Sequence, residues 1–163
     1  MARHEFDEFF STHYDHVARA LTLATGDREA AQEAAQEGFT KALRHWRRVR
    51  DAERPEAWVY VAAMNHLRDG WRSRRRRQSQ TEPTVVAADP SGVVATRLAL
   101  REAIATLSPR QREAIVLRYF ADLALADIAD AMGCAVGTVK ATLHQALNAM
   151  RLELDEEDDD ANG

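Results

Sequence analysis

The sequence predicts an all-α fold, in which two small helical bundles are joined by a flexible linker and the second bundle contains a helix-turn-helix. Apolar residues recur with the 3.6-residue period of a helix in several segments, whereas the alternation typical of strands is sustained nowhere. Glycine and proline are few, 7 and 4 in 163 residues. Two of the prolines fall within residues 78–92, QSQTEPTVVAADPSG, a composition typical of a linker.

This composition divides the chain into four expected parts. A first bundle covers residues 1–77, the linker 78–92, a second bundle 93–154 and an acidic, disordered tail 155–163. The tail begins with six consecutive acidic residues, which bring no apolar surface to bury.

Three helices are expected in the first bundle. The first presents one apolar face, made of Phe6, Phe10, His13, Val17 and Leu21. Gly26 ends this helix, and Asp27 is a good N-cap for a second helix that runs to about Trp46. A third helix begins at Pro55, because proline is favoured in the first helical turn.

The second bundle opens with a helix from Val93 to about Leu107. The next helix has a strong start signal, since Ser108 and Gln111 form a capping box around Pro109. The last part has the spacing of a helix-turn-helix: a small residue where two helices meet, glycine in the turn, and apolar residues that hold the second helix. The residues that fit this pattern are Ile128, Ala129, Met132, Gly133, Val139 and Leu143.

Positive charge is concentrated in the middle of the chain, although the whole protein has a net charge of −4. Residues 41–80 carry 12 Lys and Arg against 4 acids, whereas 1–40 and 81–163 are both acidic. A basic block of this kind favours a polyanionic partner such as nucleic acid.

One face of the third helix carries side chains suited to single-stranded DNA. Arginines neutralise phosphates, aromatic rings stack on unpaired bases and amides contact base edges. The residues opposite its core face include Trp58, Asn65, Arg68 and Arg72, and Arg47 and Arg48 extend the positive surface. The structural alternative is a solvated face with Trp58 packed against a neighbouring helix.

Signals for an enzyme are poor, so neither a catalytic residue nor a cofactor is expected. The chain has no phosphate-binding Gly-Lys-Ser/Thr loop and no His-Glu-x-x-His motif. Its one cysteine, Cys134, excludes an internal disulfide and a cysteine-based zinc site. His13 and His16 lie three apart and are the remaining candidate metal ligands, but packing of His13 on the apolar face is the simpler interpretation, and no metal is expected.

Membrane insertion is not expected either. No apolar run approaches the roughly 18 residues that a membrane helix needs. In a secretory signal an apolar segment follows the basic start, whereas here acidic residues follow within the first seven positions. A cytoplasmic location is therefore expected.

Together these segments resemble a bacterial RNA polymerase sigma factor of the extracytoplasmic-function (ECF) type, the short class with only the second and fourth conserved regions. The segment 34–39, AAQEGF, resembles the polymerase-binding helix of that family. Pro55-Glu56-Ala57-Trp58, with Asn65 and Arg68, resembles the segment that opens the −10 element. The capping-box segment 107–114 resembles the start of region 4, and 128–140 its helix-turn-helix for the −35 element.

The resemblance implies three sets of site residues. Core polymerase binding falls to Glu33, Gln36, Glu37 and Phe39. Binding of −10 single-stranded DNA falls to Arg47, Arg48, Trp58, Asn65, Arg68 and Arg72. Binding of −35 DNA falls to Thr138, Lys140 and His144. The implied partners are core RNA polymerase, promoter DNA and an anti-sigma protein.

Some positions depart from the family pattern. Glu33 stands where an aspartate is usual, and alanines at 124, 135 and 141 replace small hydroxyl residues. The helices that start near Ala124 and Ala135 therefore lack side-chain caps, each worth about 1 kcal/mol.

Three other functions stay open at this point. A stand-alone helix-turn-helix regulator would bind duplex DNA without polymerase, but basic residues are scarce after Arg118. A sigma-like decoy would bind core polymerase or an anti-sigma protein without promoter activity. A metal enzyme built on His13 and His16 comes last.

Overall fold

The computed structural model describes residues 1–77 and 93–162, and the side chains within 1–73 and 98–151. This described part is helical and contains no strand, as the sequence predicts. Its elements are α1 (Ala2–Thr25), α2 (Arg28–Arg44), α3 (Trp46–Val49), α4 (Pro55–Arg77), α5 (Val93–Ala105), α6 (Pro109–Ile115), the π-helical turn η1 (Val116–Phe120), α7 (Leu125–Met132) and α8 (Val136–Asn162). The expected linker, 78–92, lies outside the described residues.

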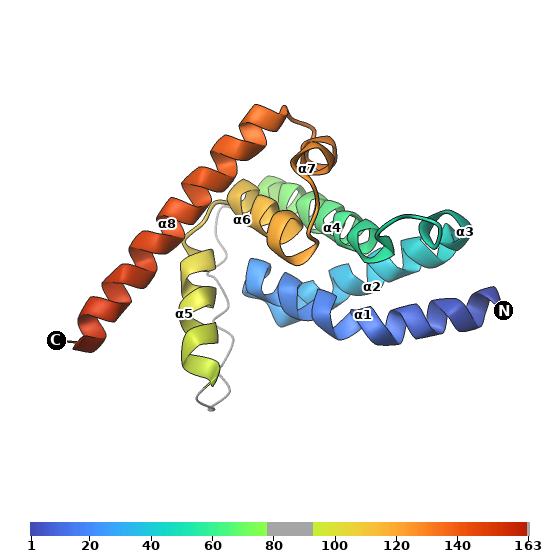
Figure 1. Ribbon diagram of the computed structural model, residues 1–163, viewed down its shortest axis with the longest axis horizontal. Helices are drawn as coiled ribbons and strands as arrows, with labels where there is room; N and C mark the ends of the chain where they lie inside the picture. Colours follow the sequence, from blue (N-terminus) through green and yellow to red (C-terminus); the bar gives the residue numbers. More distant parts are fainter. Residues whose placement is uncertain (78–92, 163) are drawn as a thin grey trace.

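The first half is a bundle in which α1, α2 and α4 lie side by side, with the short α3 at the end where α4 begins (Figure 1). The boundary between α1 and α2 follows the predicted local chemistry. Gly26 takes the left-handed conformation, φ 68°, which glycine adopts without steric cost. The Asp27 carboxylate then accepts a hydrogen bond from the Ala30 amide at 3.1 Å and caps α2.

Aromatic side chains join α1 to α2 and α3 at the N-terminal end of the bundle. Phe6 meets Trp46 edge-on, with ring centroids 5.3 Å apart, and Phe9 lies 5.7 Å from Phe39. His13 packs on Phe9, with ring centroids 4.8 Å apart, as its apolar position predicts. This cluster fixes α2 on α1 and so sets which α2 residues face outward.

Gly38 allows α2 and α4 to approach closely. A Cβ at this position would lie 2.9 Å from the Val59 carbonyl oxygen and 3.1 Å from Val59 Cγ1. We expect Gly38→Ala to lower the free energy of unfolding by about 1–3 kcal/mol, the usual cost of overpacking. Thermal and urea denaturation followed by circular dichroism measure this loss.

Gly70 provides the matched control, because it also lies in a helix of this half and a Cβ there would meet no atom within 4 Å. Gly70→Ala should leave stability unchanged or raise it by up to about 1 kcal/mol. Equal effects of the two substitutions would contradict the close approach at Gly38.

The second half begins with the predicted capping box. Ser108 Oγ accepts from the Gln111 amide, and the Gln111 side chain accepts from the Ser108 amide. Arg112 ties the preceding helix end to α6 by donating to the carbonyls of Leu107 and Ala105, at 3.0 and 2.9 Å. Burial lowers the pKa of this guanidinium. The α5–α6 corner is therefore fixed by side chains of α6.

The helix-turn-helix is formed by α7 and α8, as predicted. Gly133 takes the left-handed conformation in the turn, with φ 66°. Val139, Leu143 and Ala146 are buried and hold α8 in place, and the start of α7 at Ala124 has no side-chain cap, as expected for an alanine. The π-helical turn η1 was not anticipated.

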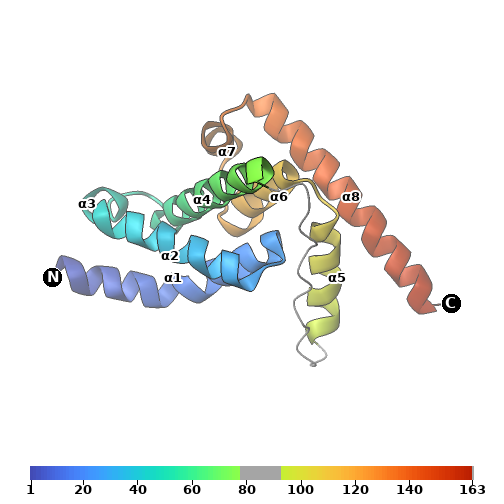
Figure 2. The same cartoon turned by 180° about the vertical axis from the view of Figure 1, so that it is seen from behind.

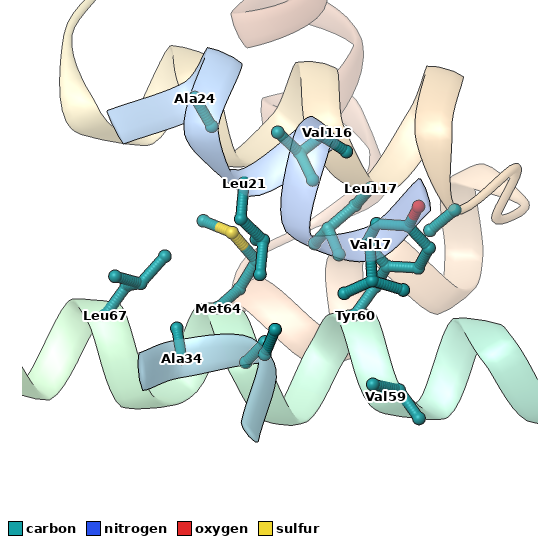
Figure 3. Close-up of a cluster of buried hydrophobic side chains, with 14 of the residues drawn as sticks. Val17, Leu21, Ala24, Ala34, Val59, Tyr60, Met64, Leu67, Val116 and Leu117 are labelled. Atoms are coloured by element: carbon teal, nitrogen blue, oxygen red, sulfur yellow. The ribbon is translucent and has the colours of Figure 1, made fainter. Parts of the chain in front are cut away.

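The two halves pack against each other and share one buried apolar cluster. Figure 3 shows Val116 and Leu117 of η1 beside Leu21 of α1 and Tyr60 and Met64 of α4. All five are at most 1% exposed. Burial also raises the pKa of the Tyr60 phenol. The sequence predicts a separate core for each bundle, whereas the buried apolar residues of both halves form one common core.

Two helix ends differ from the sequence-based expectation. The second helix ends at Arg44, and Trp46 begins the separate α3. At the other end of the chain α8 continues to Asn162 instead of ending near Leu154 and giving way to a disordered tail. Neither glycine nor proline interrupts the sequence between Gly137 and Gly163, and an existing helix adds further residues at little cost.

Candidate functional site

Three of the four residues expected to bind polymerase are accessible on α2. Glu33 and Gln36 are exposed, and Glu37 is half-buried with its carboxylate 3.8 Å from Lys41 Nζ. Adjacent helical turns place them on one outward surface, which we call the acidic α2 surface: Glu33, Gln36 and Glu37. Its carboxylates suit a basic partner surface.

Phe39 does not belong to this surface. Its side chain is only 2% exposed and packs among Phe9, Phe10 and Tyr14 of α1. The family motif alone made it a contact residue, whereas its position on the apolar face of α2 places it in the core. Phe39 therefore fixes the orientation of α2 and does not touch a partner directly.

A small pocket adjoins the acidic α2 surface and adds residues that sequence reasoning missed. It lies between α2 and α4, and His66 Nε2 stands 3.4 Å from a Glu33 carboxylate oxygen. Its lining comprises Ala30, Glu33, His66, Leu67, Gly70 and Trp71. The sequence feature that could have identified His66 as a pocket residue is its position on the face of α4 that packs against α2.

The residues expected to bind −10 DNA are mostly accessible along α4 and α3. Trp58 and Asn65 are half-buried, and Arg72 is exposed. They are spaced by seven residues, so they lie within about 40° of one another around the helix. Arg47 and Arg48 are exposed on α3, at the end of the bundle where α4 begins (Figure 1).

Trp58 combines both interpretations that the sequence left open. It packs against the core, with its ring centroid 6.1 Å from that of His45, and keeps part of its surface accessible. A half-buried aromatic ring next to the positive charges of α3 is a suitable stacking platform for an unpaired base.

Arg68 differs from the rest of this set, because it contacts the second half of the chain. Its guanidinium forms an ion pair with Glu113 of α6 and donates a longer hydrogen bond, 3.4 Å, to the Ala131 carbonyl of α7. Burial, together with the neighbouring positive charges of Arg110 and Arg72, lowers the pKa of Arg68. In this conformation Arg68 is not available to DNA.

A second ion pair joins the halves near the start of α4. Arg54 Nη1 lies 2.5 Å from Asp122 Oδ2 and donates to the Asp122 carbonyl at 2.8 Å. The hydrogen bond to the Asp122 carboxylate raises the pKa of Arg54. Sequence reasoning identified neither Glu113 nor Asp122, because their partners lie 45 and 68 positions away.

The three residues expected to bind −35 DNA are all accessible on α8, with Thr138 on one side of the buried stripe and Lys140 and His144 on the other. Thr138, Lys140 and His144 are exposed, whereas the intervening Val139 and Leu143 are buried. Since the buried pair holds α8 on the bundle, the opposite face is free for a DNA groove.

Within 1–77 and 93–162, no group of three or more His, Cys, Asp or Glu residues could hold a metal ion. Across the same part of the chain, no helix has the length and apolar content needed to span a membrane.

Comparison with known families gives two matches in chain order. Residues 9–77 match the model of sigma-70 region 2, and residues 97–150 match that of sigma-70 region 4. These ranges include the acidic α2 surface, α4 and the helix-turn-helix.

Curated relatives match over most of their length. The chain is 31% identical over 159 residues to the RNA polymerase sigma-E factor of Streptomyces avermitilis, covering 96% of this chain and 89% of the relative. It is 37% identical over 145 residues to the ECF RNA polymerase sigma factor SigL of Mycobacterium tuberculosis, covering 84% and 81%.

Among solved structures, the fold is similar to a chain in the complex of the sigma factor RpoE with the anti-sigma factor NepR from Bartonella quintana. The TM-score is 0.79, with 22% identity over 93% of this chain and 97% of that one.

Proposed function

The chain belongs to the sigma-70 family as an ECF sigma factor with regions 2 and 4, and on that basis we propose that it binds core RNA polymerase and directs it to promoters. The observation that carries this proposal is the pair of family matches, with region 2 followed by region 4 along the chain. Nucleotide addition belongs to the polymerase, so the chain itself catalyses no reaction. Its place of action is the bacterial cytoplasm, where the polymerase meets the chromosome.

Each of the three surfaces has one role in the proposal. The acidic α2 surface docks on the polymerase, the open face of α8 contacts duplex DNA at the −35 element, and α4 with α3 holds the unpaired −10 strand. Unstacking a base costs a few kcal/mol, and stacking on an aromatic ring recovers about 1–3 kcal/mol. The proposal includes an anti-sigma protein as a regulatory partner, as the family resemblance implies.

Gel filtration of the full chain with purified core polymerase tests the docking step. We expect the chain to elute with core in a one-to-one complex and to be displaced by an excess of a known sigma factor. Elution as free protein at micromolar concentrations of both would contradict the proposal and favour a stand-alone DNA-binding regulator.

Lys140 is expected to contribute one ionic contact with promoter DNA. Lys140→Ala should weaken holoenzyme binding to −35 duplex DNA and make the slope of log affinity against log salt shallower by about 1. Fluorescence anisotropy at several salt concentrations measures the slope.

Arg101→Ala is the matched control, because it removes one positive charge from α5 in the same half of the chain. It should leave the slope unchanged. A Lys140→Ala slope equal to that of the wild type would contradict DNA contact by this face of α8.

A further inference from the structure

The pocket between α2 and α4 has an apolar floor and a charged rim. Figure 2 shows these helices side by side and running in opposite directions, so the start of α2 lies beside the end of α4. Leu67 is 5% exposed and forms the floor, and Ala30 and Trp71 pack on the same core. The side chains of Glu33 and His66 at the rim are 72% and 34% exposed. An occupant would therefore meet apolar surface below and a carboxylate at one edge.

Gly70 keeps this pocket open. It lines the pocket, and a Cβ added to it would have no atom within 4 Å. The empty volume, with the open mouth included, is about 340 Å³, at the lower end of the range for ligand sites. A space of this size suits one protruding side chain better than a cofactor-sized ligand.

The charges around the pocket favour a cation. Glu29, Glu33 and Glu37 follow one another at intervals of four residues, so their carboxylates form a row along one side of α2. Like charges at this spacing repel each other, and a cation placed beside them relieves the repulsion. His66 Nε2 lies 3.4 Å from Glu33, yet most of the Glu33 side chain stays exposed. The pocket opens into the acidic α2 surface, because Glu33 belongs to both.

We propose that the pocket between α2 and α4 receives an arginine side chain of core RNA polymerase, with its guanidinium paired to the Glu33 carboxylate and stacked on the Trp71 ring. This inference rests on the proposed function. A guanidinium is planar and weakly hydrated, pairs with a carboxylate through two parallel hydrogen bonds and stacks on aromatic rings. The ammonium of lysine is compact and strongly hydrated, so it suits an open surface better. The methylenes of the arginine would cover Leu67.

The pocket gives the docking surface a selectivity that charge alone does not provide. Any basic surface is attracted to the carboxylates of α2, whereas the pocket binds best a partner that places a guanidinium at one position beside them. Gly70 and Trp71 are therefore specificity-determining residues, and Gln36 and Glu37 belong to the surface around them.

Gly70→Leu tests the pocket without disturbing the core, because the added side chain occupies the open space beside Gly70. We expect the Kd for core polymerase to rise about tenfold, as for the loss of one anchoring side chain. Fluorescence anisotropy of the labelled full chain, titrated with core, measures this change. Ser73→Leu is the matched control, because it adds the same side chain at an exposed position of α4 outside the pocket lining. It should leave the Kd unchanged.

Two substitutions of Trp71 distinguish a stacked cation from simple packing. Leucine keeps an apolar side chain and removes the ring, whereas phenylalanine keeps a ring. Trp71→Leu should raise the Kd for core about 2- to 30-fold, the range of cation–π contacts, and Trp71→Phe should raise it less. Equal losses in two folded variants would overturn the proposal. Because Trp71 packs against the core, circular dichroism checks both variants, and Gly70→Leu decides the matter if either is unfolded.

A direct titration of the full chain without polymerase measures recognition of the guanidinium itself. The probe is N-acetylarginine methylamide, and NMR follows the Trp71 indole N–H signal, which is identified by its absence in Trp71→Phe. We expect a saturable shift at about millimolar probe concentrations. Binding should be roughly fivefold weaker, or more, in Glu33→Gln and in Gly70→Leu. N-acetylnorleucine methylamide, which carries no charge, should produce no saturable shift.

The outcomes separate the pocket from the proposed function. The proposal is overturned if the wild-type chain binds core and Gly70→Leu binds it equally well, or if the two probes shift the indole signal equally. A wild-type chain that does not bind core would overturn the proposed function and, with it, the polymerase as the source of the arginine. The titration would still decide whether this pocket recognises a guanidinium.

Discussion

Reversing the charge of the acidic α2 surface, by Gln36→Lys together with Glu37→Lys, is expected to abolish copurification with core polymerase. Both positions lie on the outward side of α2, whose inner side is fixed by Phe39 in the core. Like charges placed opposite each other at an interface cost several kcal/mol, so the affinity should fall at least a hundredfold. Affinity capture of the tagged chain from a mixture with core, quantified on a gel, measures the loss.

The matched control places the same charge change on another exposed helical surface of this half. Ser11→Lys together with Asp15→Lys adds as much positive charge to α1, one turn apart. Core binding should persist in this control. Undiminished capture of the α2 variant, or equal losses in both variants, would contradict docking through the acidic α2 surface.

Trp58→Ala together with Asn65→Ala is expected to impair promoter opening far more than formation of the closed complex. Trp58 provides a half-buried aromatic ring, and Asn65 provides an amide seven residues further along the same side of α4. Both side chains suit unpaired bases rather than duplex. Loss of about 1–3 kcal/mol of stacking corresponds to roughly a 5- to 150-fold drop in open complex. Permanganate footprinting reports unpaired thymines, and a gel shift of the holoenzyme on duplex promoter reports closed binding.

Rescue by Trp58→Tyr distinguishes stacking from a purely structural role. Trp58 also packs against the core and lies near His45, so truncation to alanine loses stability as well. The single variant Trp58→Tyr, with Asn65 unchanged, keeps an aromatic ring. It should therefore open the promoter much better than the double alanine variant. Equal losses in closed binding and opening would contradict the assignment of these residues to the single strand.

The parts of the fold that the sequence predicts well depend on interactions between near neighbours. Asp27 caps α2, Ser108 and Gln111 complete a capping box, and Gly133 adopts a positive φ in the turn. In each case the chemistry is decided within about four residues. Helical periodicity likewise distinguishes the buried face of α4 from the face with Trp58, Asn65 and Arg72, because burial repeats with the turn of the helix.

The contact between the halves could not be predicted from the same signals. Arg68 lies on the polar side of α4. An arginine at such a position fits the sequence pattern of a phosphate contact and that of an ion pair with Glu113 equally well. Nothing periodic links residues 45 or 68 positions apart. Phe39 illustrates a different case, because the family motif suggested a polymerase contact whereas the side chain is buried against α1.

Run-off transcription with purified core polymerase and a pool of genomic promoter fragments tests the central claim most directly. The account predicts that adding the full chain to core yields new transcripts with defined 5′ ends, that core alone yields none of them, and that the Gln36→Lys, Glu37→Lys variant removes them. A chain that binds core and leaves the transcripts unchanged would contradict initiation by this protein and would make it a decoy for the polymerase.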